Sequence, residues 1–179
     1  MKRISPKDLN NLQLQTLLQT AIAPRPIALA STIDKDGNVN LSPFSFFNMF
    51  STNPPVVIFS PSRRVRDNTT KHTLENVHEV AEVVIGIVNY NIVQQISLAS
   101  TEYEKGVNEF VKSGLTMKEA DLVKPQLIEE CPVNLECKVL EIKALGSEGG
   151  AGNLVICEII KIHVREEYLN EEGNLDQKK

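Results

Sequence analysis

Residues 60–73 carry the cluster of charged and hydroxyl groups best suited to binding an anion. Five Ser and Thr hydroxyls surround four cationic side chains, which are those of Arg63, Arg64, Arg66 and Lys71. The segment leads into a predicted helix with Thr73 as candidate N-cap, so free backbone amides and the helix dipole would add to the positive charge. Because a phosphate has three oxygens to satisfy, cations alternating with hydroxyls suit it better than a carboxylate. A solvated basic loop is the alternative.

A second candidate for ligand contact is the end of the strand predicted over residues 26–33. Ser31 and Thr32 stand there, with hydroxyls and amides that can reach a phosphate or the edge of a ring. The small side chains of Ala28 and Ala30 leave room beside this strand for a bulky group. The same residues are equally compatible with a barrel strand that carries small side chains at a tight corner.

Four of the six phenylalanines lie within seven residues, at Phe44, Phe46, Phe47 and Phe50. Core strands ordinarily alternate apolar and polar residues and favour Val and Ile, whereas residues 40–48 interleave the rings with Pro, Ser and Asn. This composition is typical of a wall against which a planar ligand lies, with backbone and hydroxyl groups at its polar edge. An irregular corner of the core is the alternative.

Neither a metal centre nor a catalytic side chain is predicted. The histidines, His72, His78 and His163, show no metal-ligand spacing, and the three cysteines form no CxxC pair. No GxSxG, Cys/His or Ser/Lys arrangement marks a hydrolase. The Gly-rich residues 146–152 do not match GxGxxG and predict a flexible hairpin connection.

Composition limits the class of protein further. The chain has 179 residues, 41% hydrophobic and 23% charged, which predicts a single globular domain. Its net charge of −4 disfavours a general nucleic-acid-binding surface. No apolar run approaches the roughly 18 to 20 residues that span a bilayer, and the first residues lack the apolar stretch of a signal peptide. We therefore expect a cytoplasmic protein without nucleic-acid or membrane partners.

The elements that must position these residues are mostly strands. Strands are predicted over residues 26–33, 39–41, 56–60, 83–88, 133–145 and 154–164. Helices are predicted over residues 6–18, 73–81, 91–99 and 105–112. Asp36 and Gly37 make a hairpin turn between the first two strands. Because the helices interrupt the strands irregularly, the pattern favours a β-barrel or open β-sandwich with helical insertions over a doubly wound βαβ fold.

Taken in order, several segments resemble the flavin reductase-like family of FMN-binding split-barrel proteins. The resemblance begins with Arg-Pro-Ile-Ala-Leu-Ala-Ser-Thr at residues 25–32 and continues through Asn-Leu-Ser-Pro-Phe-Ser-Phe-Phe-Asn at 40–48. Lys-His-Thr-Leu-Glu-Asn at 71–76 is similar to the family's Lys-Asp-Thr-x-x-Asn motif, with His72 in place of Asp. Further landmarks lie at residues 109–116 and 132–137. Each motif is weak alone, but their shared order, from about residue 20 to about 168, identifies the family.

The resemblance implies a mainly β fold, a six-stranded Greek-key split β-barrel with helical insertions. It implies a homodimer with one FMN per subunit near the interface. The whole chain would be one FMN-binding domain, with an N-terminal extension over about residues 1–20 and a flexible tail over about 168–179.

The resemblance also implies which residues contact the cofactor. Ser31 and Thr32 would line the flavin or its phosphate. The loop from Pro43 to Asn48 would run along the isoalloxazine edge and offer the amides of Ser45, Phe46 and Phe47 and the side chain of Asn48. The ribityl phosphate would be held by hydroxyls and cations, namely Ser60, Ser62, Lys71 and Thr73, with Arg64 or Arg66 in addition.

The resemblance favours an oxidoreductase in which NADH or NADPH passes a hydride to flavin N5. A flavin carries its own electrophilic centre, so the missing nucleophile does not count against an enzyme. One alternative is a non-catalytic, flavoredoxin-like FMN carrier that takes electrons from a protein partner. Another is a β-barrel module that binds a different planar ligand.

Overall fold

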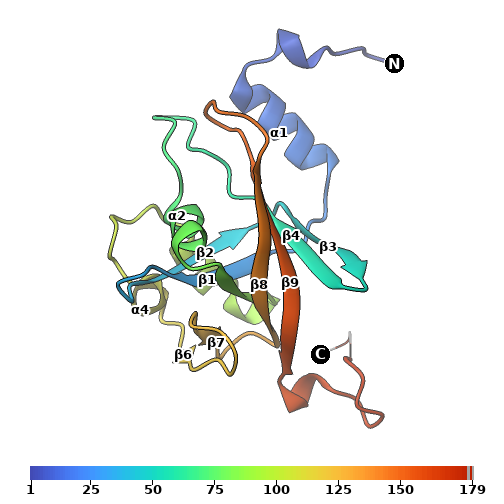
Figure 1. The fold of residues 1–179 in the computed structure, drawn as a ribbon. Helices are drawn as coiled ribbons and strands as arrows, with labels where there is room; N and C mark the ends of the chain where they lie inside the picture. Colours follow the sequence, from blue (N-terminus) through green and yellow to red (C-terminus); the bar gives the residue numbers. More distant parts are fainter. Residues whose placement is uncertain (177, 179) are drawn as a thin grey trace.

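The computed structural model describes residues 1–176 and 178, and one antiparallel sheet of seven strands dominates it (Figure 1). The strands follow the order β2-β1-β5-β8-β9-β4-β3. Their bounds are β1 Ala28–Ile33, β2 Val39–Phe44, β3 Phe47–Thr52, β4 Pro55–Phe59, β5 Glu82–Ile87, β8 Val133–Ala144 and β9 Asn153–Val164. Two short strands, β6 Met117–Lys118 and β7 Leu127–Ile128, form a separate ribbon. The mainly β prediction is confirmed.

The sheet has one strand more than the six predicted, because the phenylalanine-rich segment is not a loop. β2 continues beyond residue 41 through Ser42 and Pro43 to Phe44, and the chain then turns back into β3. β3 pairs with β4 from Phe47 opposite Phe59 to Thr52 opposite Pro55.

Both faces of the central strands are buried, which explains their continuous apolar runs. On β1, Ala28 and Ala30 belong to one hydrophobic cluster, whereas Leu29 belongs to another on the opposite face. On β5, Val83 and Val84 divide in the same way.

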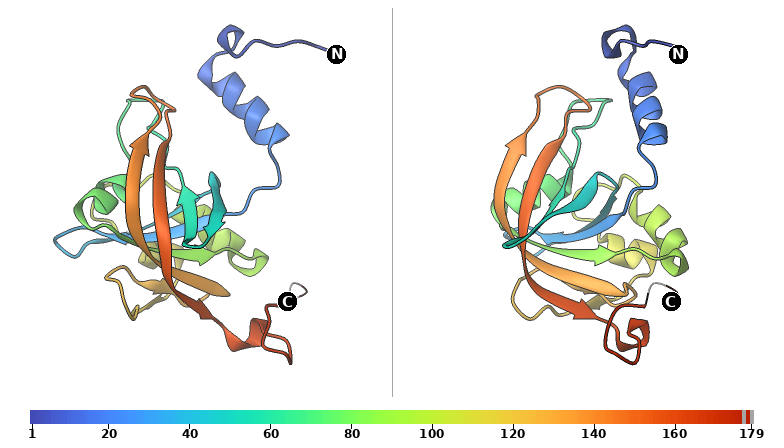
Figure 2. Two further views of the ribbon diagram at one scale, coloured as in Figure 1. Left: turned by 45° about the vertical axis from the view of Figure 1, so that its right-hand side comes forward. Right: turned by 90° about the vertical axis from the view of Figure 1, so that its right-hand side faces the viewer.

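Within residues 1–176, three of the four α-helices cover these two clusters. Their bounds are α1 Asn11–Ala21, α2 His72–Glu79, α3 Val93–Ala99 and α4 Glu109–Ser113, with 3-10 turns η1 Pro6–Asp8, η2 Tyr90–Ile92 and η3 Glu166–Tyr168. Leu74 and Val77 of α2 pack into the first cluster. Ile96 of α3 and Phe110 of α4 pack into the second. α1 alone among the helices stands clear of the sheet, and it has no buried residue (Figure 2).

Several predicted helix boundaries differ from the structure. The predicted helix over 6–18 becomes a 3-10 turn followed by α1, because Asn10 forms a capping box with Gln13 and fixes the helix start there. The predicted helix over 105–112 is reduced to α4, which Asn108 caps. Thr73 is not the N-cap of α2, a prediction that was wrong, because the cap position is occupied by Lys71.

The β8–β9 hairpin extends well beyond the rest of the sheet, and its tip rises beside α1 (Figure 2). None of the helices within residues 1–176 is long and apolar enough to cross a bilayer. Of the tail predicted over 168–179, residues 177 and 179 lie outside the described residues. Before them, the amide of Asp176 donates to the carbonyl of Tyr168.

Candidate functional site

A cavity of about 610 Å³ lies between α1, the loop of residues 62–71 and the tip of the β8–β9 hairpin. One face of α1 lines it with apolar side chains, Leu14, Leu18 and Ile22. The opposite walls are polar or backbone, formed by Ser62, Arg63, Arg64, Lys71 and the hairpin tip Gly149, Gly150 and Ala151. Further lining residues are Asn11, Gln15, Gln19, Arg25, Phe46 and Val65. Its size and its mixture of apolar and cationic walls suit a small planar molecule with an anionic group.

The loop of residues 62–71, which we call the cationic loop, is joined to the hairpin tip by backbone hydrogen bonds. The amide of Arg63 donates to the carbonyl of Ala151 (2.8 Å), and the amide of Gly150 donates to the carbonyl of Arg63 (3.0 Å). This approach requires glycine, because a Cβ on Gly149 would lie 3.0 Å from the Cα of Val65 and one on Gly152 would lie 2.6 Å from Ser60 Oγ. The Gly-rich segment therefore does more than connect two strands, and forms part of the cavity wall.

The arginines of the loop are largely occupied by their own loop. The Nε of Arg63 donates to Asn68 Oδ1 (2.7 Å). Arg64 donates to Thr69 Oγ1 (3.1 Å) and to the carbonyl of Thr70. Arg66 does not line the cavity; its exposed guanidinium donates to Asp67 Oδ2 (3.0 Å). Of the two candidate phosphate arginines, Arg64 alone borders the cavity, and most of its donors already have partners.

Lys71 differs from these arginines. It lines the cavity and is partly buried, and no ion pair or hydrogen bond of its ammonium group occurs among residues 1–176 and 178. Burial lowers the pKa of Lys71, and the positive charge of Arg64 lowers it further. A cation held partly out of water without a partner is energetically costly, and a bound anion would relieve that cost.

Arg25 fixes the apolar wall. Its guanidinium donates to the carbonyl of Gln19 (2.5 Å) and to that of Ile22, both in the last turn of α1 or at its end. Its Nε also contacts Ser45 Oγ at 3.4 Å. At the other end of the helix, Asn11 Nδ2 donates to the carbonyl of Gly149 (3.2 Å). Because α1 buries no residue, these polar contacts hold it over the cavity.

The predicted aromatic wall is divided between the cavity and the core. Phe46 lines the cavity and is 44% exposed. Phe44 is buried and packs on Phe59 with ring centroids 5.4 Å apart, and Phe47 packs against the same cluster. Three other predicted contacts, Pro43, Ser45 and Asn48, do not line the cavity, although Ser45 meets Arg25.

Four predicted hydroxyl contacts are buried and do not line the cavity. Ser31 and Thr32 are fully buried, and Thr32 Oγ1 accepts from Asn76 Nδ2 (3.2 Å). Thr73 is 1% exposed and its Oγ1 accepts from Asn40 Nδ2 (2.9 Å). Ser60 is buried against Gly152. Thr73 borders a polar pocket of about 30 Å³ whose lining also includes Arg64 and Lys71, so this pocket adjoins the main cavity.

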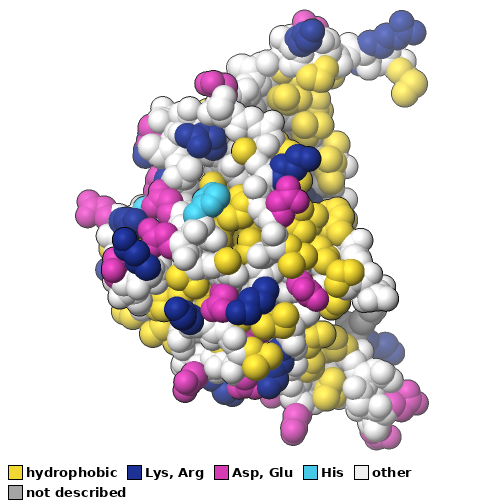
Figure 3. All heavy atoms as spheres, viewed as in Figure 1, with side chains coloured by type: hydrophobic (Ala, Val, Ile, Leu, Met, Phe, Trp, Pro, Cys, Tyr) yellow, Lys and Arg dark blue, Asp and Glu magenta, His cyan; other side chains and the backbone are white. Residues whose placement is uncertain are grey.

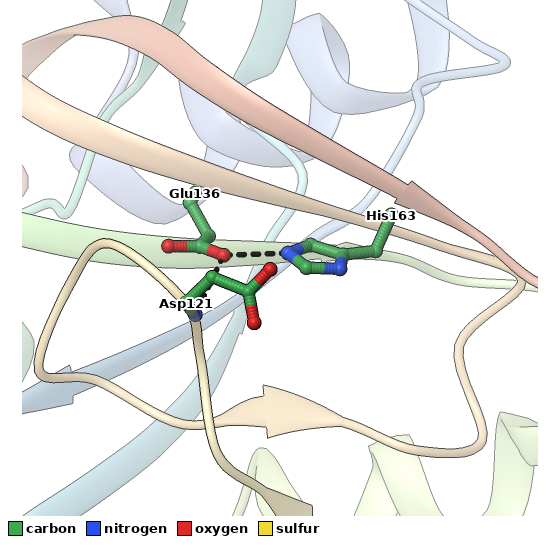
Figure 4. Close-up of side chains that lie close together, drawn as sticks. All are labelled: Asp121, Glu136 and His163. Carbon is green, nitrogen blue, oxygen red and sulfur yellow. Dashed lines mark hydrogen bonds and ion pairs between the residues drawn. The ribbon is translucent and has the colours of Figure 1, made fainter.

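A separate cluster, Asp121, Glu136 and His163, brings three possible metal ligands within 4.8 Å of one another (Figure 4). Glu136 is fully buried and accepts the amides of Asp121 (3.0 Å), Leu122 (2.6 Å) and Val123 (3.1 Å), while His163 Nε2 lies 2.5 Å from it. Asp121 pairs with Lys161. Since these carboxylates already have partners, the arrangement anchors the loop of residues 121–123 to β8 and β9.

Comparison with known proteins relates the chain to a single family. The model of the flavin reductase like domain matches residues 20–178. An uncharacterized protein of Aquifex aeolicus is 35% identical over 173 residues, 97% of this chain and 86% of that protein. The structure is similar to nitrilotriacetate monooxygenase component B from Bacillus cereus, with 26% identity, a TM-score of 0.90 and coverage of 98% and 86% of the two chains. It is also similar to a flavin-reductase-like protein with a split barrel domain from Shewanella frigidimarina, with 25% identity, a TM-score of 0.81 and the same coverage.

Proposed function

Because the chain belongs to the flavin reductase like family and has its split-barrel fold, we propose that it is an FMN-binding oxidoreductase that accepts hydride from NADH or NADPH. FMN occupies the cavity between α1, the cationic loop and the β8–β9 hairpin. A bound flavin supplies the electrophilic ring for hydride transfer, and the protein supplies binding, orientation and electrostatics.

The observation that carries this proposal is Lys71, which lines the cavity together with Ser62, is partly buried and has no ion pair within the part of the chain that the structure describes. A terminal phosphate offers several charged oxygens, so an ammonium and a hydroxyl can bind it together. Arg64, which also borders the cavity, adds positive charge from behind. This grouping favours FMN over riboflavin, which has the same ring system but no phosphate.

The apolar walls suit the ring system. Leu14 and Leu18 of α1 and Ile22 directly after it line the cavity on one side, and Phe46 lines it as well. These side chains offer an apolar surface to a planar ligand, whose polar edge would face the backbone and Arg25. We assign Ser31, Thr32, Ser60 and Thr73 to the support of the barrel beside the site, because their side chains are buried and do not line the cavity.

A second copy of the chain is the partner that the surface fits best. Hydrophobic side chains gather along α1 and down the same side of the molecule (Figure 3). They include exposed residues of α1 and β3, with Leu12 72%, Met49 60% and Phe50 64% exposed. A contiguous apolar patch of this kind marks an interaction surface. We therefore assign it to a homodimer, which sedimentation analysis of the wild type and of Phe50→Asp will test.

An electron carrier is the second candidate. The structural similarity to a component of a monooxygenase favours a chain that passes electrons to a partner. The residues that line the cavity include no catalytic side chain that would assign the chain to a reductase and not to a carrier. Anaerobic reduction separates the two. A reductase loses its flavin absorption band when NADH or NADPH is added. A band that survives both donors and bleaches with a reduced redox protein assigns the carrier function, and failure to take up any flavin contradicts both.

A further inference from the structure

Glu102 forms ion pairs with two arginines of the cationic loop, Arg64 and Arg66. It lies between α3 and α4, far from the loop in sequence. Its Oε1 forms an ion pair with the Nε of Arg64 and lies 3.4 Å from an amino nitrogen of Arg66. Glu102 also lines the small polar pocket together with Lys71 and Arg64, next to the main cavity.

The two partners of this contact differ in how firmly they are held. The side chain of Arg64 is 16% exposed and is fixed by the Thr69 and Thr70 contacts, whereas that of Glu102 is 47% exposed. Moving Glu102 therefore leaves the loop intact, and the carboxylate can swing into water at little cost. The carboxylate of Glu102 thus pairs with the same cation, Arg64, that an anionic group of a ligand would approach.

We propose that Glu102 is an affinity-determining residue of the anion site, which competes with the phosphate of the bound flavin for Arg64. The inference rests on the proposed function and adds to it that binding is weakened from within. A phosphate entering beside Lys71 must displace the carboxylate from Arg64 or bear its repulsion. Both the displacement and the repulsion lower the affinity for FMN, whereas riboflavin, which has no phosphate, is unaffected. FMN therefore dissociates faster than it would from the same cations without Glu102.

The test compares Glu102→Gln with Glu104→Gln. Glu104 lies on the same segment, its substitution removes the same charge, and its carboxylate makes no ion pair within residues 1–176 and 178. Dissociation constants of FMN and riboflavin are measured by fluorescence quenching at low and high salt. Glu102→Gln is expected to bind FMN about two- to fivefold more tightly than wild type, as an exposed ion pair warrants. The dissociation constant of riboflavin should not change in Glu102→Gln, and neither dissociation constant should change in Glu104→Gln. The gain in FMN affinity of Glu102→Gln should shrink at high salt.

Each remaining outcome overturns a specific statement. If Glu102→Gln binds FMN no more tightly than wild type, or tightens FMN and riboflavin equally, the competition does not exist. The proposed function survives both results, provided that the wild type binds FMN and loses it on substitution of Lys71. If the wild type takes up neither flavin, the proposed function itself fails.

Discussion

The side chain of Arg25 joins Ser45 to the end of α1, with its Nε 3.4 Å from Ser45 Oγ and its terminal nitrogen donating to the carbonyls of Gln19 and Ile22. A guanidinium can make these contacts together because its five N–H donors are spread over three nitrogens in one plane. An ammonium carries its three donors on a single nitrogen and cannot reach all of these acceptors at once. The side chain of Arg25 thus links the apolar wall of the cavity to the β2–β3 turn.

Arg25→Lys is therefore expected to loosen α1 and weaken binding of FMN and riboflavin alike, by about five- to thirtyfold, as the loss of one or two charged hydrogen bonds implies. Titration of each flavin into the variant measures this. Arg3→Lys, outside the cavity, is the matched control. A loss confined to FMN would place Arg25 at the phosphate and contradict its role as a support for the wall.

Glu136→Gln tests the anchor of the loop of residues 121–123. The wild-type carboxylate is fully buried and accepts three backbone amides and a contact from His163. An amide cannot accept through its nitrogen, so the variant leaves at least one buried donor without a partner. We expect the free energy of unfolding to fall by about 2 to 4 kcal/mol at pH 7, measured by urea denaturation.

The pH dependence of this loss has a defined sign. Burial opposes ionisation of Glu136, but the hydrogen bonds from His163 and the backbone outweigh it, so its pKa lies below the ordinary value of 4.5. The carboxylate therefore contributes stability above pH 4.5, and this contribution is lost as the pH falls through the lowered pKa. The difference between wild type and Glu136→Gln should shrink between pH 4.5 and pH 3. A constant difference over that range contradicts the account.

Gly86 lets β5 pass close to the segment that follows β7. A Cβ at this position would lie 2.6 Å from Cys131 Sγ and 3.0 Å from Ile128 Cδ1. Gly86→Ala should therefore destabilise the protein by about 1 to 3 kcal/mol, the usual cost of overpacking a core. Cys131→Ala removes the sulfur, so the double variant should be more stable than the sum of the single effects predicts. Strict additivity in chemical denaturation would show that the crowding lies elsewhere.

The sequence patterns were sufficient for the strongly apolar strands. The run around Val83 and the two long strands near the end of the chain were predicted within one or two residues, the first because it is continuously apolar and the others because they combine β-branched residues with an alternation of apolar and polar side chains. Ser42 and Pro43 concealed the extension of β2, since polar residues and proline are typical of loops. The cap of α1 was missed although Asn10 and Gln13 have the spacing of a capping box.

The candidate site was predictable only where composition marks it. Ser62, Arg64, Lys71 and Phe46 were named in advance and line one cavity. The wall formed by α1 and the hairpin tip was not predicted, because it depends on contacts between residues more than a hundred positions apart, such as Asn11 with Gly149. Nor does a sequence reveal that Arg63 donates to Asn68 of its own loop, or that Arg64 donates to Thr69 and Thr70 and pairs with Glu102. The spacing of Gly149 and Gly152 was the available signal, since both approach another backbone segment or a buried hydroxyl closely.

The most direct test of the flavin site is the pair of dissociation constants for FMN and riboflavin in Lys71→Met, with Lys112→Met as an exposed control. Loss of the charge removes its attraction to the phosphate, so FMN binding should weaken by about 10- to 100-fold, and riboflavin by less than about threefold. Titration of both flavins into the three proteins, followed by fluorescence, gives the comparison. Equal losses of FMN and riboflavin, or unchanged FMN binding, would contradict the assignment of the phosphate to Lys71.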